Sequence, residues 1–472
     1  MRPGMILFSV VVLFLCAGIL TPKEMLEGFS NKGMITVALL FLVSEGIRQS
    51  GTLGQVIKKL LPQGKTTVFK AQLRILPSVA FISAFLNNTP VVVIFAPIIK
   101  HWAKSVNLPA TKFLIPLSYV TILGGICTLI GTSTNLVVHG MILEAGFEGF
   151  SMFELGKVGI FIAIAGIIYI FLFSKRLLPD ARPDTAVPDE EVEEGEKLHR
   201  VEAVLGARFP GINKKLKDFN FQRHYGAEVK EIKTRNGQRF VTNLDDVVLH
   251  EGDTLVVMAD DTFIPTWGES SVFVLLTNGN EPDTTGKKKR WFALLLLVLM
   301  IVGATVGELP VTKEMFPDIK LDMFFFVSIT TIIMAWTNLF PARKYTKYIS
   351  WDILITIACA FAISKAMVNS GVADSVAKFI IGLSDDYGPH VLLAMLFIIT
   401  NLFTELITNN AAAALAFPLA LSIASQLGVS PTPFFVVICM AASASFSTPI
   451  GYQTNLIVQG IGNYKFTDFV RI

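Results

Sequence analysis

The sequence is short of charged residues. Of its 472 residues only 16% are Asp, Glu, Lys or Arg, while 52% are hydrophobic and the mean hydropathy is +0.58. Soluble domains average about 25% charged residues, so a soluble protein is excluded. Several apolar runs approach the roughly 20 residues that cross a bilayer as a helix. The composition therefore predicts a multi-pass protein of the cell (cytoplasmic) membrane, with the lipid bilayer as a partner.

Cysteine is also scarce, and no catalytic or nucleotide-binding motif is present. The four cysteines, Cys16, Cys127, Cys359 and Cys439, lie far apart in apolar segments without CxxC or His pairing. This spacing excludes a disulfide framework and a metal cluster, and it predicts buried small hydrophobic side chains. Without a P-loop or a catalytic triad, neither ATP-driven transport nor an enzyme is supported, and we expect no cofactor.

Long apolar runs are what the sequence does contain. We expect spans at about 5–20, 33–50, 113–140, 155–174, 291–309, 323–340, 350–369 and 434–459. No small-residue cleavage site follows the first run, which indicates a retained helix rather than a signal peptide. Two further stretches, 73–99 and 390–423, break at Asn87-Asn88-Thr89-Pro90 and at Thr408-Asn409-Asn410. Each is either a kinked continuous span or a re-entrant hairpin.

Flanking charges favour hairpins. Basic residues stand on both sides of the first stretch: Lys58, Lys59, Lys65, Lys70, Arg74, Lys100, Lys104 and Lys112. After the second stretch, no Lys or Arg lies between Ala424 and Tyr464. Because cytoplasmic loops are rich in Lys and Arg, the first hairpin is predicted to open to the cytoplasm and the second to the outside. Each arm of about 15 residues, roughly 22 Å, is too short to cross alone.

The polar breaks recur in both halves of the chain. Gly131-Thr132-Ser133-Thr134-Asn135 and Gly451-Tyr452-Gln453-Thr454-Asn455 are separated by the same offset in sequence as Gly51 and Gly371, and Asn88 and Asn409 by one position more. Matching breaks in two hydrophobic halves indicate the binding site of a secondary transporter. The predicted fold is an all-α polytopic membrane protein with inverted repeats and two re-entrant hairpins, at about 72–100 and 390–424, plus an inserted α+β cytoplasmic domain.

Residues between the halves have a different composition. We predict transmembrane repeat 1 at 1–174, an acidic linker at 175–198, a soluble domain at 199–276, a basic linker at 277–290 and transmembrane repeat 2 at 291–472. Strand-like alternation and turn signals at Asn236-Gly237 and Glu251-Gly252-Asp253 mark the domain. The run Lys287-Lys288-Lys289-Arg290 anchors the next helix on the inner side, so no nucleic acid is expected as a partner.

The residue types in the breaks suit small ions. Backbone freed at membrane depth can ligate a cation through its carbonyls, and helix N-termini favour an anion. Amide and hydroxyl oxygens of Asn and Thr are hard, neutral ligands for Na⁺, and their N–H and O–H groups can donate to an oxyanion. Glu45 and Arg48 are spaced to pair. Glu405, four residues before Asn409 and so expected on the same helix face, has either a structural or a cation or proton role.

These motifs together resemble the divalent anion:sodium symporter family of the ion transporter superfamily. Its members typically move sulfate or dicarboxylates with Na⁺ as the coupling ion, and we expect a homodimer. The insert resembles a TrkA-C (RCK C-terminal) domain through Tyr225-Gly226-Ala227-Glu228-Val229 and Leu249-His250-Glu251-Gly252-Asp253-Thr254-Leu255. It lacks a GxGxxG half, so a small regulatory ligand is expected there in place of NAD. The resemblance also implies a further helix after Asp468-Phe469.

The same resemblance assigns the site residues. The Na⁺ ligands would be Asn88, Asn409, Gly131, Thr132, Ser133, Asn135, Thr448, Gly451 and Asn455. The substrate anion would meet Asn87, Thr89, Thr408, Asn410, Thr134 and Thr454, with Thr89 facing Asn410. Asn87, Thr408 and Asn410 depart from the Ser-Asn-Thr tips of the family, which favours an inorganic oxyanion such as sulfate over a dicarboxylate. Alternatives are a TrkA-C-regulated cation transporter or channel and a Na⁺/H⁺ antiporter.

Overall fold

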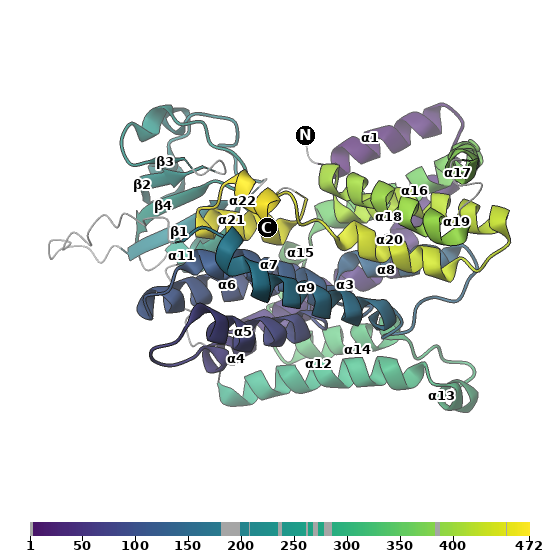
Figure 1. Ribbon diagram of the computed structural model, residues 1–472, viewed down its shortest axis with the longest axis horizontal. Coiled ribbons are helices and arrows are strands. Elements are labelled where there is room, and N and C mark those ends of the chain that lie inside the picture. Colours follow the sequence, from purple (N-terminus) through teal and green to yellow (C-terminus); the bar gives the residue numbers. More distant parts are fainter. Residues whose placement is uncertain are drawn as a thin grey trace.

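Helices make up most of the protein, and a small sheet stands at one end (Figure 1). The computed structural model describes residues 3–180, 199–206, 208–234, 238–260, 263–267, 272–277, 286–382, 388–449 and 451–472. The expected acidic run Asp189–Glu194, the Asn236-Gly237 turn and residues 278–285 of the basic linker lie outside these ranges.

The helices before the sheet are interrupted where the sequence predicts breaks. They are α1 (Pro3–Cys16), α2 (Pro22–Glu27), α3 (Lys32–Gln49), α4 (Thr52–Leu60), α5 (Val68–Ser83), α6 (Asn88–Ser105), α7 (Leu114–Gly125), α8 (Ser133–Glu144) and α9 (Gly156–Leu177). The stretch 73–99 thus divides at Asn87, and the expected span 113–140 divides between α7 and α8.

The helices after the sheet follow the same plan. They are α12 (Lys287–Gly307), α13 (Pro310–Met315), α14 (Met323–Trp336), α15 (Tyr345–Tyr348), α16 (Trp351–Asn369), α17 (Val372–Gly382), α18 (Pro389–Leu406), α19 (Asn409–Leu427), α20 (Thr432–Ser443), α21 (Gln453–Gly462) and α22 (Phe466–Arg471). The stretch 390–423 divides at 407–408, and the expected span 434–459 divides between α20 and α21.

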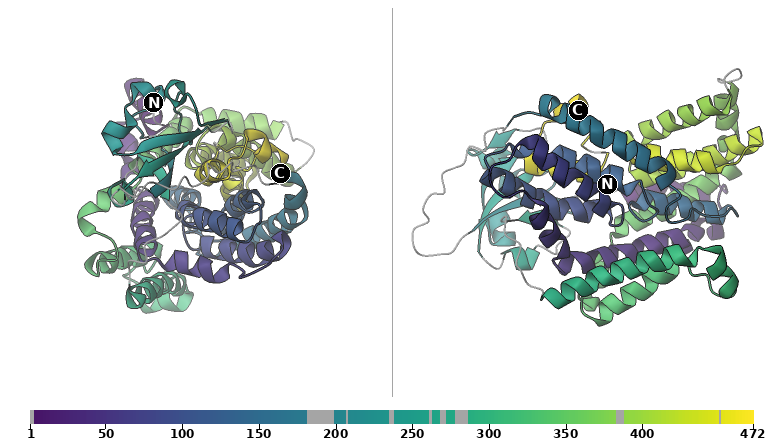
Figure 2. Two further views of the ribbon diagram at one scale, coloured as in Figure 1. Left: turned by 90° about the vertical axis from the view of Figure 1, so that its left-hand side faces the viewer. Right: turned by 60° about the horizontal axis from the view of Figure 1, so that its bottom comes forward.

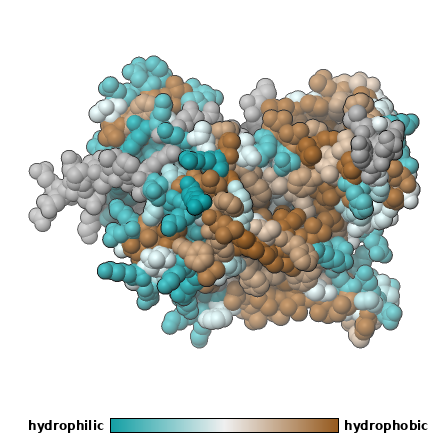
Figure 3. Space-filling view, in the orientation of Figure 1, coloured by the Kyte–Doolittle hydropathy of each residue, from teal (hydrophilic) through white to brown (hydrophobic). Residues whose placement is uncertain are grey.

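Six helical segments of the described chain are long and apolar enough to cross a membrane. They are Pro22–Gln49, Gly156–Leu177, Lys287–Gly307, Trp351–Asn369, Pro389–Leu406 and Asn409–Leu427. Apolar side chains cover the middle of the molecule, and polar ones gather toward its two ends (Figure 3). Exposed Phe161 and Leu172 of α9 and Leu295 of α12 suit contact with lipid. The helical part is therefore built as a polytopic membrane protein.

The sheet has five antiparallel strands in the order β3-β2-β4-β1-β5. They are β1 (His199–Leu205), β2 (Glu228–Lys233), β3 (Arg239–Phe240), β4 (Thr254–Ala259) and β5 (Phe273–Thr277), with the short helices α10 (Phe221–Tyr225) and α11 (Phe263–Trp267). A separate core of aromatic and aliphatic side chains, among them Phe209, Tyr225 and Leu255, supports it. This region is a small α+β unit with its own core.

The sheet packs on one helix from each half of the chain, and turned views keep it at the same end of the helical body (Figure 2). From α6, Lys100 Nζ lies 3.0 Å from each carboxylate oxygen of Glu202 on β1, and Lys233 Nζ lies 3.4 Å from Glu202 Oε1. Burial alone would raise the pKa of Glu202, but these two ammonium groups outweigh it and lower the pKa to about 2. On α21, Leu456 lies against Gly252.

Two expectations for lone residues meet different outcomes. Glu45 and Arg48 pair as expected, with Arg48 Nη2 2.7 Å from Glu45 Oε1. Cys359 and Cys439 are buried and all four cysteines are free thiols, but Cys16 is exposed and Cys127 half-buried. The prediction of burial was wrong for Cys16 because α1 packs through one face, around Val11, and leaves the other face uncovered.

Candidate functional site

Four helix breaks meet in the middle of the helical body. They separate α5 from α6, α7 from α8, α18 from α19 and α20 from α21. Glycines let the chain segments approach closely: a Cβ on Gly124 would lie 2.1 Å from the carbonyl oxygen of Ala80, and one on Gly131 would lie 2.4 Å from that of Gly125. Contacts at such range exclude any side chain, so these positions require glycine.

Two buried asparagines close the longer breaks in the same way. Asn135 Nδ2 donates to the carbonyl oxygens of Thr128 at 2.8 Å and Gly125 at 3.4 Å. Asn455 Nδ2 donates to those of Ser445 at 2.9 Å and Thr448 at 3.2 Å. Both bonds reach back by seven and ten residues in each half. The repeated Asn therefore encodes a shared backbone frame.

Asn88 stands at the centre of the first-half site and is fully buried. With its amide oriented to satisfy its neighbours, Nδ2 donates to the carbonyl oxygens of Thr121 at 3.1 Å and Gly131 at 3.3 Å, and Oδ1 accepts from the Tyr452 hydroxyl at 2.6 Å. The same hydroxyl lies 3.2 Å from Thr132 Oγ1, and it interacts with the Asn409 side chain. Tyr452 thus lies between the two break asparagines.

Further contacts cross between the halves in matching positions. Thr89 Oγ1 donates to Gln453 Oε1 at 3.3 Å. Ser133 and Thr134 donate to Asn410 Oδ1 at 3.2 and 3.3 Å. Each tip residue therefore meets the start of a helix of the opposite half, α21 or α8. These side-chain bonds of Thr89 and Asn410 go to those helices rather than to each other. The breaks form one continuous polar cluster.

Four helix N-termini open onto this cluster. The helices α6, α8, α19 and α21 begin after Asn87, Thr132, Thr408 and Tyr452, and none of these residues makes a side-chain cap bond. Their first N–H groups are left for other acceptors. The segments 85–92, 128–137, 405–413 and 445–458 contain no Lys, Arg or His. Any positive potential for an anion here comes from helix ends and bound cations.

Carbonyl-bearing helix ends reach the same place, and one buried oxygen has no partner. The helices α5, α7, α18 and α20 end at the breaks. Asn135 Oδ1, on a side chain that is 0% exposed, makes no hydrogen bond in the described structure. An unpaired buried amide oxygen among free carbonyls is a ready ligand for a hard cation such as Na⁺. The residues expected to hold Na⁺ therefore fit that ion chemically.

Glu405 lies in the last turn of α18. The expectation that it shares a helix face with Asn409 was wrong, because α18 ends at Leu406 and a new helix begins at Asn409. Its carboxylate reaches the α20–α21 break, where Oε2 accepts from Thr448 Oγ1 at 2.7 Å and Oε1 accepts from the Ser447 N–H at 3.2 Å. Thr448 Oγ1 in turn accepts from the Gly451 N–H at 3.1 Å.

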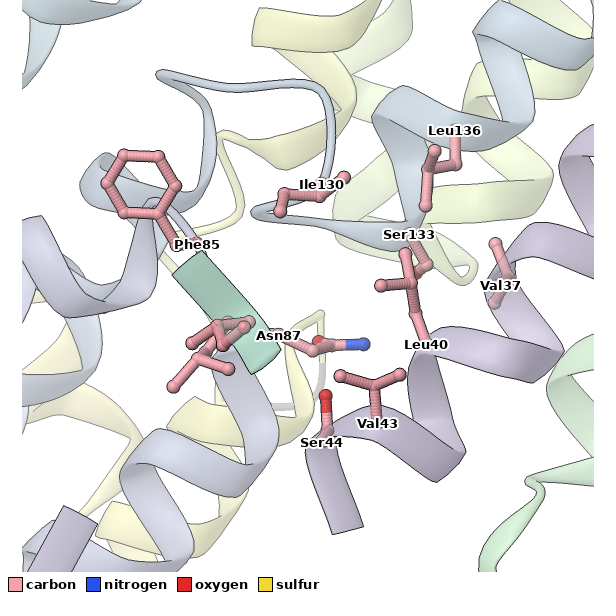
Figure 4. Close-up of a pocket in the computed structure, with 11 residues that line it drawn as sticks. Val37, Leu40, Val43, Ser44, Phe85, Asn87, Ile130, Ser133 and Leu136 are labelled. Carbon is pink, nitrogen blue, oxygen red and sulfur yellow. The ribbon is translucent and has the colours of Figure 1, made fainter. Parts of the chain in front are cut away.

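The remaining predicted residues have unequal surroundings. Asn87 extends from the first break toward Ser44 and Ser133 (Figure 4). Mostly apolar side chains line the cavity around it, which has a volume of about 10 Å³. Thr454 is buried and accepts from Ser118 at 2.9 Å, whereas Thr408 is exposed. Since that cavity holds about one water molecule, it must widen before it can admit an oxyanion.

Sequence reasoning assigned no role to several residues of the cluster. Tyr452, Gln453 and Ser118 bridge the halves. The Ser83 hydroxyl accepts from the Asn88 amide at 2.8 Å, and the Thr404 hydroxyl donates to the Asn409 amide at 3.0 Å. The repeat holds the signal for some of them: Tyr452 and Gln453 are the counterparts of Thr132 and Ser133, at the offset that relates Asn455 to Asn135. Nothing in the local pattern marks Ser118, which lies inside the apolar helix α7.

Comparisons with known proteins agree with the arrangement. A family model described as citrate transporter matches residues 1–428 and again residues 320–471. The chain is 30% identical to an uncharacterized transporter of Synechocystis, over 98% of this chain and 89% of the relative. It is 23% identical to probable sodium/sulfate cotransporter 3 of Chlamydomonas reinhardtii, over 99% of this chain and 84% of the relative. Sodium/sulfate cotransporter 2 of that alga is 31% identical over 58% of this chain and 30% of the relative. With breaks, repeat and cluster in place, this chain belongs to the citrate transporter family.

Proposed function

We propose that this protein is a secondary active transporter that carries a divalent oxyanion, sulfate before a dicarboxylate, together with Na⁺ by alternating access. The observation that carries the proposal is the meeting of four N-terminal and four C-terminal helix ends at one polar cluster. Such ends offer N–H groups to an anion and carbonyl groups to a cation side by side. The sodium/sulfate names of two relatives favour sulfate.

The anion is held by helix ends in this proposal. Each N-terminus carries about +0.5 charge, so the four together offer about +2, comparable to the charge of a sulfate dianion. The hydroxyl of Thr89 and the amides of Asn87 and Asn410 can add donors. Because the break segments contain no Lys, Arg or His, neutralisation at the site depends on these dipoles and on co-bound cations. This dependence is the physical reason for coupling.

The cations are held by oxygen atoms around each break asparagine. In the first half, Asn135 Oδ1 and the carbonyl oxygens near Gly131 and Thr128 supply ligands. In the second half the corresponding groups surround Asn409, Thr448 and Gly451. A bound Na⁺ next to a bound dianion lowers the free energy of both, so each ion raises the affinity for the other.

The two halves are proposed to be inverted repeats whose α5–α6 and α18–α19 pairs are re-entrant hairpins. The matched bonds of Asn135 and Asn455, and basic residues flanking only the first pair, support this view. On a cysteine-free background, Gln63→Cys and Lys104→Cys should both react with a membrane-impermeant maleimide from the inside. His390→Cys and Ser430→Cys should both react from the outside. If the two cysteines of either pair reacted from opposite sides, the two helices between them would together cross the membrane instead of forming a re-entrant hairpin.

The sheet unit is proposed to be a TrkA-C-like regulatory domain on the cytoplasmic side. Its separate core and its docking on α6 and α21 support a body that can sense a ligand and act on the helices. Added protease should remove this domain's epitopes in inside-out membrane vesicles and leave them intact in right-side-out ones. Protection of those epitopes in inside-out vesicles, with exposure in right-side-out ones, would overturn the cytoplasmic placement.

Transport in proteoliposomes tests the main proposal. Radiolabelled sulfate should accumulate under an inward Na⁺ gradient and remain at background when K⁺ or choline replaces Na⁺. Asn88→Ala and Asn409→Ala should each remove the Na⁺-dependent part. Asn369→Ala, an exposed asparagine at the end of α16, is the matched control and should retain it. Equal sulfate uptake with and without Na⁺ would refute coupling, and uptake of a dicarboxylate alone would reassign the substrate.

A further inference from the structure

The two cation sites share a frame but differ in the residues placed inside it. The Asn88 amide donates to the Ser83 hydroxyl and the Asn409 amide accepts from the Thr404 hydroxyl, so each hydroxyl lies five residues before its asparagine. The asparagines Asn135 and Asn455 close both breaks with matching bonds. With the frame matched in this way, each position in one half can be compared with its counterpart in the other half.

The first difference is a carboxylate. Glu405 occupies the position that Ala84 has in the first half, at the offset that relates Asn409 to Asn88. In the first half the Thr128 hydroxyl donates to the backbone carbonyl of Ala84, whereas in the second half the Thr448 hydroxyl donates to Glu405 Oε2 at 2.7 Å. A carboxyl side chain therefore lies where the first half has only a peptide oxygen.

The second difference is a buried hydroxyl. Ser445 occupies the position that Gly125 has in the first half, at the offset that relates Asn455 to Asn135, and is 0% exposed. Its Oγ makes no hydrogen bond within the described structure. It lies against the Cα of Gly451: a Cβ built there would be 1.9 Å from Ser445 Oγ, 3.1 Å from Thr448 Oγ1 and 3.2 Å from Glu405 Oε2. In the first half the equivalent Cβ of Gly131 would meet only backbone atoms of Gly125.

Three side-chain oxygens thus converge on one point beside Gly451, and one of them is unpartnered. Carboxylate, hydroxyl and carbonyl oxygens are the ligands that hard cations prefer. An ionisable side chain at membrane depth needs a partner charge or a function. The hydrogen bonds from Thr448 and Ser447 satisfy part of the carboxylate, but they leave its charge uncompensated by any Lys, Arg or His of the four break segments.

We propose that Glu405 and Ser445, with Thr448 and the backbone at Gly451, form the tighter of two unequal cation sites, which Na⁺ occupies before the site around Asn88. This inference rests on the proposed Na⁺ coupling. The order follows from charge: the first cation enters where a carboxylate attracts it, and the second enters a site of neutral ligands. The substrate dianion then binds to a cluster that already carries positive charge.

The test is the thermal stability of purified protein in detergent, titrated with NaCl at constant ionic strength against choline chloride and without sulfate. The unchanged protein should be stabilised in two phases. Glu405→Gln, which retains shape and hydrogen bonding, should shift the tighter phase to about 10- to 100-fold higher Na⁺. Ser445→Gly, which introduces the residue of the first half, should shift the same phase to higher Na⁺ by a smaller factor. Asn88→Ala should weaken the other phase.

A matched control separates a cation role from a structural one. Glu308 is also half-buried and accepts a backbone N–H, from Met152 at 3.0 Å, but lies outside the breaks. Glu308→Gln should leave both Na⁺ phases in place. A tight phase unchanged in Glu405→Gln, with the protein still stabilised by Na⁺, would overturn the unequal sites and leave Na⁺ coupling standing. A complete lack of stabilisation by Na⁺ in the unchanged protein would overturn both.

Discussion

The two halves of this transporter have the same backbone closure, through Asn135 and Asn455, but their α5–α6 and α18–α19 breaks differ in solvent exposure. Leu86, at the first break, is 5% exposed, and Asn88 beside it is fully buried under the Tyr452 hydroxyl from the other half. At the second break Leu406 is 82% exposed and Ile407 is 39% exposed. The position of Tyr452 is taken in the first half by the smaller Thr132. A repeated sequence motif therefore fixes the frame of a site, while single substitutions within it fix the chemistry and access.

Removing the closing asparagines should break both halves equally and have the largest effect. Asn135→Ala and Asn455→Ala each leave two buried carbonyl oxygens without their donor. At about 1–3 kcal/mol for each unsatisfied group, we expect a loss of about 2–6 kcal/mol and no transport. Thermal unfolding and sulfate uptake measure this, with Asn369→Ala as control. A large effect in one half only would show that the frame is not shared.

Adding a methyl group at the matched glycines should have different consequences in the two halves. In Gly131→Ala the new Cβ meets a backbone oxygen at 2.4 Å, which cannot move cheaply. In Gly451→Ala it meets the Ser445 side chain, which Ser445→Gly removes. We expect about 1–3 kcal/mol of destabilisation for each single variant and recovery of stability only for the second-half pair Gly451→Ala with Ser445→Gly. Failure of the double variant to recover would place the strain in the backbone.

Tyr452→Phe should have a moderate effect on the apparent Na⁺ affinity, because the tyrosine hydroxyl serves both halves. The hydroxyl contacts Asn88, Thr132 and Asn409, so its loss removes a donor shared by both sites while retaining the ring. We expect about tenfold weaker apparent Na⁺ affinity in uptake, from about 1.5 kcal/mol of lost hydrogen bonding. Tyr169→Phe, which loses a bond to the Ile472 carbonyl, is the control and should leave the Na⁺ affinity unchanged. An unchanged affinity in Tyr452→Phe would make the hydroxyl a packing contact.

The smallest expected effect is that of acid. It should weaken the contact of the sheet with the first half more than its contact with the second half. The first half holds the sheet through Lys100–Glu202 and the second through apolar packing at Gly252 and Leu456. Since the pKa of Glu202 is lowered to about 2, its stabilisation is complete above its ordinary value near 4.5 and declines as the pH falls below that. Protection from hydrogen exchange at the end of α6, measured relative to the intrinsic exchange rate at each pH, should therefore fall between pH 5 and pH 3 by about threefold more than at the end of α21.

A variant can check the origin of that acid effect. Glu202→Gln should make the protection from exchange at the end of α6 insensitive to pH in this window, because the titrating group is gone. Glu228→Gln removes half of an exposed pair with Lys230 and should change exchange little. Equal acid sensitivity of α6 and α21 in the unchanged protein would mean that the ion pair does not dominate the docking.

The sequence predicted the frame of the site better than its contents. Asn88, Asn135, Asn409 and Asn455 were found from the repeat alone, because polar residues in apolar segments are conspicuous. The contacts of Tyr452 with both halves and the inward turn of Glu405 could not be predicted, because a helix break changes direction by an amount that periodicity does not encode. The docking of Glu202 on Lys100 likewise joins residues about a hundred positions apart without a local signal.

The sheet touches α6 and α21, the two helices that start at the polar cluster from opposite halves. A change in the angle between these helices therefore has to tilt the sheet or release one of its two contacts. A pair of fluorophores, one on the sheet and one at the Gly307 end of α12, would report movements of α6 and α21 while every residue of the cluster stays unlabelled.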